Sequence, residues 1–157
     1  MSVSTNGQIC YGLLCEDGTK FPWDAEKYAG DIETWWRDVH DYRPSVELYD
    51  EDGEYLGGQE PSQAQLDTYF AEYHAWYKAH PLPVELVNYC SDDLPMFILA
   101  VPTTCLRCER GYPAQFEPSA LTVDIAALGR LEAFCDQYGI EYEIDSQLGW
   151  WLSSYWG

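Results

Sequence analysis

Hydrophobic residues recur at helical spacing in three segments of the chain, and each segment predicts an amphipathic helix. The first follows Asp31, a favourable N-cap residue, and its apolar stripe consists of Ile32, Trp35, Trp36 and Val39. The second opens with a capping box of Ser62 and Gln65, and its stripe consists of Leu66, Tyr69, Phe70, Tyr73, Trp76 and Tyr77. The third covers about residues 122–138, and its inner face is predicted as Ile125, Leu128, Leu131, Phe134 or Cys135, and Tyr138.

Other segments carry the shorter patterns of strands. The apolar run 9–15 is followed by Asp17-Gly18 and a few residues before Pro22, which predicts a hairpin. A second hairpin is predicted around the acidic turn 50–53, with Val46 and Leu48 facing the core. Further strands are predicted at 84–89, 96–101, 140–144 and 150–156.

These elements predict an α+β fold. About three helices are expected to pack on a mostly antiparallel sheet of five or six strands, because hairpins and short turns favour antiparallel pairing. The length of 157 residues fits one domain over 1–157, and the apolar content of 46% is enough to build a substantial core.

The charge of the chain is strongly one-sided. It has 27 acidic and 8 basic residues, and its net charge is −19. Residues 16–60 alone hold 14 acids and 4 bases. Direct binding to nucleic acid or to an anionic membrane is not expected, since both need lysine and arginine on the protein. The expected partner is a basic protein, for instance a nuclease or another nucleic-acid-binding protein.

The tryptophans of residues 16–60 are predicted to lie inside, which leaves the carboxylates for binding. The candidate partner-binding residues are Asp24, Glu26, Glu33, Asp38, Asp41, Asp50, Glu51, Asp52 and Glu54. Carboxylates on a folded frame can imitate the phosphates of DNA, which follow one another at about 1.7 Å of helix axis. The sequence therefore predicts a non-enzymatic inhibitor of a basic partner: a DNA mimic, a phage anti-defence protein or an immunity-type protein. The competing explanation is that the acidic residues serve only to keep the protein soluble.

Two other interpretations stay open at this point. Cys105 and Cys108 form a CxxC pair, which suits two thiolates of a zinc site if Cys10, Cys15, Cys90 or Cys135 completes it. The loop from Cys105 to Pro118 would then belong to a small-ligand or zinc-binding domain, with or without enzymatic activity. Alternatively, the aromatic strand from Trp150 to Trp156 has a row that can pair two copies in a dimer.

Motifs for catalysis and for cofactor binding are missing. The chain has no G-x-S-x-G and no phosphate-binding glycine loop, so no catalytic residue and no cofactor is predicted. The first residues are polar and no apolar run approaches the length of a membrane span. A cytoplasmic location is expected, with the six cysteines mostly reduced and the oligomeric state open.

Overall fold

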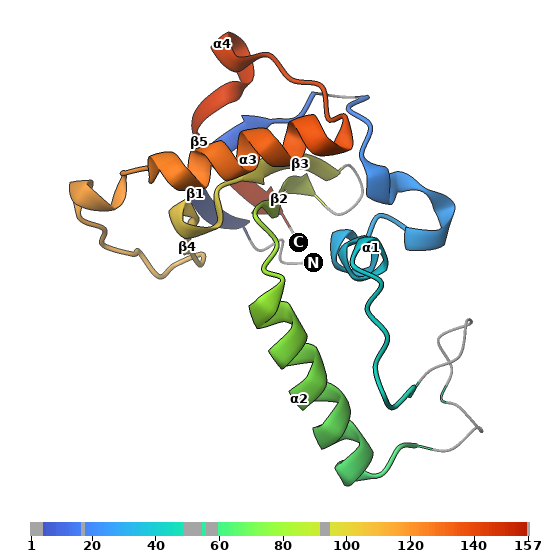
Figure 1. Cartoon of the computed structure of the whole chain (residues 1–157). Coiled ribbons are helices and arrows are strands. Elements are labelled where there is room, and N and C mark those ends of the chain that lie inside the picture. The colour runs from blue at the N-terminus through green and yellow to red at the C-terminus, as the bar shows by residue number, and fades with distance from the viewer. Residues whose placement is uncertain (1–4, 17, 49–54, 56–59, 92–94, 157) are drawn as a thin grey trace. The chain divides into compact units, whose positions relative to one another are not determined.

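A computed structural model describes residues 5–16, 18–48, 55, 60–91 and 95–156 (Figure 1). The described chain divides into two compact units. The first, here called the sheet unit, comprises residues 1–30 and 83–157, and the second, the helical unit, comprises residues 31–82. The α+β class is confirmed, with four α-helices and a five-stranded mixed sheet among the described residues. That residues 1–157 form a single domain stays a prediction.

The sheet is mainly antiparallel, as predicted, and partly closes on itself. Its strands are β1 (Thr5–Leu14), β2 (Glu85–Ser91), β3 (Pro95–Ala100), β4 (Leu106–Cys108) and β5 (Leu148–Trp156). They run in the order β3-β2-β5-β1-β4, with β2 and β5 parallel over a short contact. The second half of β1 also pairs with β3, so β1, β5, β2 and β3 form a ring.

The ring encloses one small core, and α3 (Ile125–Tyr138) covers another. Cys10, Val87, Ile98 and Ala100 are buried together on the inner face of the strands. Leu13 and Leu99 alternate with them and are buried on the opposite face. Figure 1 shows α3 lying across the sheet, and its buried residues are Ala127, Leu131, Phe134 and Cys135.

The helical unit contains two predicted helices with their predicted caps. In α1 (Ile32–Val39) the Asp31 side chain accepts a hydrogen bond from the Glu33 amide at 2.9 Å. In α2 (Gln63–Ala79) Ser62 and Gln65 form the capping box. Both N-termini are thus defined by side chains that satisfy free backbone amides.

Several predictions of local structure are wrong. Residues 19–21 form no strand, and a 3-10 turn (Pro22–Asp24) follows them. Residues 140–143 are irregular and lead into the short helix α4 (Ile144–Gln147) in place of the predicted strand. Ile125 is 84% exposed, because α3 begins only at this residue. In the predicted second hairpin, the described residues 45–48 form no strand, although Leu48 is buried as expected, and Tyr55 forms an isolated β-bridge.

Candidate functional site

The helical unit is held together by a cluster of aromatic and histidine rings. The Trp36 indole Nε1 donates a hydrogen bond to the His80 carbonyl oxygen at 2.9 Å. The His40 ring lies 4.3 Å from the Trp36 ring and 5.0 Å from the His80 ring, centroid to centroid. The Tyr42 ring packs at 4.7 Å from Trp76. These contacts join α1, the chain that follows it and the C-terminal end of α2.

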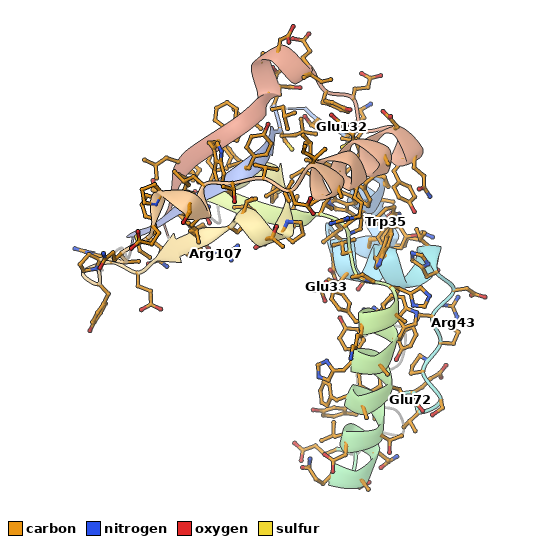
Figure 2. All side chains as sticks on the ribbon, turned by 60° about the vertical axis from the view of Figure 1, so that its left-hand side comes forward. Glu33, Trp35, Arg43, Glu72, Arg107 and Glu132 are labelled. Atoms are coloured by element: carbon orange, nitrogen blue, oxygen red, sulfur yellow. The ribbon has the colours of Figure 1, made fainter. Side chains whose placement is uncertain are left out.

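Hydrogen bonds also hold α1 and the chain that follows it against α2. The Tyr73 hydroxyl donates to Glu33 Oε2 at 2.9 Å, and burial together with this carboxylate raises the pKa of Tyr73 to about 12. The Ser45 amide and hydroxyl both donate to the Glu72 carboxylate, which lowers the pKa of Glu72. Figure 2 shows Glu33, Arg43 and Glu72 on this unit. The carboxylates of Glu33 and Glu72 are therefore held by hydrogen bonds to other residues of the helical unit.

The bond from Trp36 to His80 gives a first prediction. Phenylalanine at position 36 keeps a ring beside His40 but removes the Nε1–H donor. We expect W36F to lower the free energy of unfolding of the helical unit by about 1–2 kcal/mol, measured by urea denaturation. W150F is the control, because it makes the same exchange at a half-exposed ring of the sheet unit. Equal losses in the two variants would contradict the role of the hydrogen bond.

The pair of histidines gives a second prediction, on pH. Burial, and then His80, lower the pKa of His40 below its ordinary value of 6.5. The folded unit therefore binds fewer protons than the unfolded chain below this pH, and stability is lost as the pH falls from 6.5 toward the lower folded pKa. Between about pH 7.5 and pH 5.5, the melting temperature of the wild type should fall further than that of His40→Asn. The control His74→Asn should keep the wild-type dependence.

The candidate carboxylates do not all belong to one unit. Those in the described residues are exposed: Asp24 and Glu26 lie in the sheet unit, and Glu33, Asp38 and Asp41 lie in the helical unit. Asp50, Glu51, Asp52 and Glu54 lie outside the described residues. The described candidate partner-binding residues are therefore divided between the two units.

Asp38 and Asp41 are brought together by one arginine. Arg43 Nη2 lies 3.8 Å from Asp38 Oδ1 and 3.3 Å from Asp41 Oδ1. Asp41 has a φ of +50°, a left-handed conformation that aspartate tolerates better than most residues. All three side chains are well exposed, so each ion pair contributes little to stability. The group retains one net negative charge.

Two other candidates have structural roles. Asp24 Oδ2 accepts a hydrogen bond from the Phe21 amide at 2.7 Å and so caps the 3-10 turn. Glu33 accepts the bond from Tyr73 described above. Each carboxylate can accept further hydrogen bonds from a partner, but it already accepts one within the protein.

The sheet unit contains an acidic hollow of about 670 Å³ that the sequence does not predict. Its charged lining consists of Glu16, Lys20, Glu141 and Glu143. The walls come from the turn after β1 and from the connection between α3 and α4. The sequence predicts an amphipathic strand at 140–144, in which Glu141 and Glu143 alternate with Ile140, Tyr142 and Ile144. Their alternation with apolar residues gave no signal of a concave site.

The two cysteines of the CxxC pair lie on opposite faces of an extended segment. Cys108 lies at the end of β4, and Cys105 immediately precedes that strand in an extended conformation. Extended residues three positions apart point to opposite faces. Among the described residues no group of three His, Cys, Asp or Glu side chains is arranged to hold a metal ion. The zinc interpretation of the loop from Cys105 to Pro118 stays a prediction, and this geometry counts against it.

The last strand, β5, has two different faces. Trp151 points inward and its Nε1 donates to the Gly12 carbonyl oxygen at 3.0 Å. Leu152, on the other face, is 82% exposed, and Trp150 beside it is half-exposed against Tyr11. The side chains of β5 that are available to pack against another molecule are therefore those on the face with Trp150 and Leu152.

Comparisons with protein-family models, with curated proteins and with solved structures find no match for this chain. In the part of the chain that the structure describes, no helix is both long and apolar enough to cross a membrane.

Proposed function

We propose that this protein is an acidic, non-enzymatic binding protein that blocks a basic partner, and that it does so in the cytoplasm. The observation that carries the proposal is the excess of 27 acidic over 8 basic residues on a folded frame. Even if every basic side chain paired with one carboxylate, most carboxylates would keep their full charge. Such a surface attracts a basic protein from a distance and speeds its association.

The helical unit is the denser of the two acidic surfaces. Its 52 residues hold 12 acids and 3 bases, whereas the 105 residues of the sheet unit hold 15 acids and 5 bases. The aromatic cluster between α1 and α2 supplies a frame for these charges, which an acidic disordered segment lacks. A frame of this kind supports DNA mimicry, in which carboxylates occupy the phosphate sites of a nuclease or another nucleic-acid-binding protein.

Capture at several salt concentrations tests the proposal. The immobilised protein is exposed to a bacterial lysate, and retained proteins are identified by mass spectrometry. We expect a basic nucleic-acid-binding protein whose capture falls at least about tenfold between 50 and 300 mM salt. Added protein should also displace that partner from its nucleic acid. Salt-independent capture, or capture without displacement, would contradict the blocking of a nucleic-acid site.

A second candidate function is self-association, favoured by the exposure of Leu152 on β5. In that case Trp150 and Leu152 pack against a second copy. Sedimentation should then show a dimer at micromolar concentration that Leu152→Asp converts to a monomer. A wild type that sediments as a monomer at the same concentration would remove this candidate.

A further inference from the structure

Cys10 and Cys105 face each other across the pairing of β1 and β4. The antiparallel register joins Gly7 with Cys108 and Ile9 with Leu106, so its next position joins Cys10 with Cys105. The pairing extends further, because the Tyr11 amide donates to Thr104 Oγ1 at 3.0 Å. Two cysteines far apart in sequence are thereby placed directly opposite each other.

The two thiols differ in their access to solvent. Cys10 is 1% exposed and belongs to the core enclosed by the ring of strands. Cys105 packs against that core but is only half-buried. Arg107 and Glu85 form an ion pair beside it, with half-exposed side chains. A small reagent therefore reaches Cys105 before it reaches Cys10.

Three of the other four cysteines, Cys15, Cys108 and Cys135, lie in different surroundings. A Cβ atom built on Gly7 would come within 3.0 Å of Cys108 Sγ, which places Cys108 beside Gly7 and not beside Cys10. Burial raises the pKa of Cys15 to about 11 and that of Cys135 to about 12. Both side chains are also buried, at 8% and 0% exposed, so a small oxidant has no direct access to either thiol.

We propose that Cys10 and Cys105 are a redox-sensitive pair that forms a reversible disulfide when the protein meets a small disulfide oxidant. Cross-strand neighbours have Cβ atoms about 4.5–5.5 Å apart, and a disulfide needs about 3.5–4.5 Å, so a small shift closes the bond. Cys105 lies just before β4, a three-residue strand that pairs only with β1 among the described strands, so this shift is confined to one short segment.

The two thiols also influence each other electrostatically. A hydrogen bond from Cys105 lowers the pKa of Cys10, and Arg107 acts in the same direction. The same bond to Cys10, burial and the Glu85 carboxylate raise the pKa of Cys105. The S–H of Cys105 thus favours a thiolate on Cys10, and the two thiols titrate as a coupled pair.

Oxidised glutathione is the oxidant for which the reaction is written. Cys10 first loses its proton to water. Cys105 Sγ then attacks one sulfur of the oxidant while its own proton passes to the Cys10 thiolate, which forms a mixed disulfide and releases glutathione thiolate. Cys10 gives its proton to that thiolate. Its sulfur then attacks Cys105 Sγ, which forms the internal disulfide and releases a second glutathione thiolate that takes up the first proton. Two thiols are oxidised and one disulfide is reduced to two glutathione molecules.

The new bond would close a loop of about 95 residues and tether β4 to β1. A loop of this length restricts the unfolded chain strongly, so oxidation should raise the melting temperature by about 5–10 °C. Reduction with dithiothreitol should reverse the change.

The experiment treats the full-length protein with a tenfold excess of oxidised glutathione and counts its thiols after denaturation. We expect the six thiols of the reduced protein to fall to four, with the mass of two hydrogen atoms lost and no bound glutathione. Fragmentation of the linked peptides should join Cys10 to Cys105. C10S should instead keep glutathione on Cys105 as a stable mixed disulfide.

C108S is the matched control, since it removes the other cysteine of the CxxC pair and should oxidise as the wild type does. The linked peptides of the wild type are assigned without any variant, so poor folding of C10S would not affect the result. Six remaining thiols, or a bond between Cys105 and Cys108, would overturn the proposal. A bond between Cys15 and Cys135 as the main product would overturn it as well.

Discussion

Replacing Gly12 with alanine is expected to lower the free energy of unfolding by about 3 kcal/mol or more. A Cβ atom at this position would lie 2.4 Å from the Leu99 carbonyl oxygen and 2.6 Å from Ala100 Cα. Both neighbours are backbone atoms of β3, and Gly12 also pairs with Gly149 of β5 on its other side. The strand is held between two partners, so the contact can be relieved only by breaking the ring of strands.

Gly149→Ala provides a matched control for this prediction. Gly149 is the register partner of Gly12 in β5, and a Cβ atom there has no neighbour within 4 Å. We expect it to change the free energy of unfolding by less than about 1 kcal/mol. Urea denaturation of the two variants measures the difference, and equal stability would show that β1 does not approach β3 this closely.

Trp23→Ala is the second variant with a large expected effect, a loss of about 3–5 kcal/mol. The Trp23 side chain is 1% exposed. Its ring stacks on Phe21 at 4.7 Å and lies 6.3 Å from the Phe134 ring of α3. Removing the indole leaves a cavity between the turn after β1 and the covering helix, and such a cavity cannot collapse without moving both.

Tyr112→Ala is the control for the loss of a large ring. Tyr112 is 74% exposed, so its removal should change the stability by less than about 0.5 kcal/mol. Thermal and urea denaturation of both variants give the comparison. A Trp23→Ala protein as stable as the Tyr112→Ala protein would mean that Phe21 and Phe134 pack without the indole.

The parts of the fold with strong local signals could be predicted from the sequence. The N-caps at Asp31 and Ser62 define α1 and α2, and the apolar runs define β2 and β3. The prediction failed where a short alternating pattern was the only guide. Residues 140–144 alternate like a strand, but Gln147 Oε1 accepts a hydrogen bond from the Glu143 amide and begins a helix there. Alternation alone therefore does not distinguish a strand from a helix in so short a segment.

The arrangement of the candidate sites depended on contacts that the sequence does not encode locally. The acidic stretch 16–60 crosses the boundary between the two units at Gly30, so its first carboxylates belong to the sheet unit. Cys10 and Cys105 meet only through the register of β1 with β4. In the sequence Cys105 forms a CxxC pair with Cys108, but in the sheet it lies opposite Cys10.

We propose that carboxylates at defined positions, rather than net charge alone, bind the basic partner. The test compares two double variants with the same net charge. Asp38→Lys with Asp41→Lys changes the pair beside Arg43 in the helical unit. Glu117→Lys with Asp136→Lys changes two exposed carboxylates of the sheet unit. Circular dichroism and melting temperatures establish that both variants are folded.

The measurement is the dissociation constant of each double variant for the basic protein captured at low salt. We predict that the Asp38 and Asp41 variant binds at least about tenfold more weakly than the wild type. The Glu117 and Asp136 variant should stay within about threefold of the wild type. Equal weakening in both variants, or no weakening in either, would show that the acidity acts through net charge or solubility, and would contradict the proposed binding face.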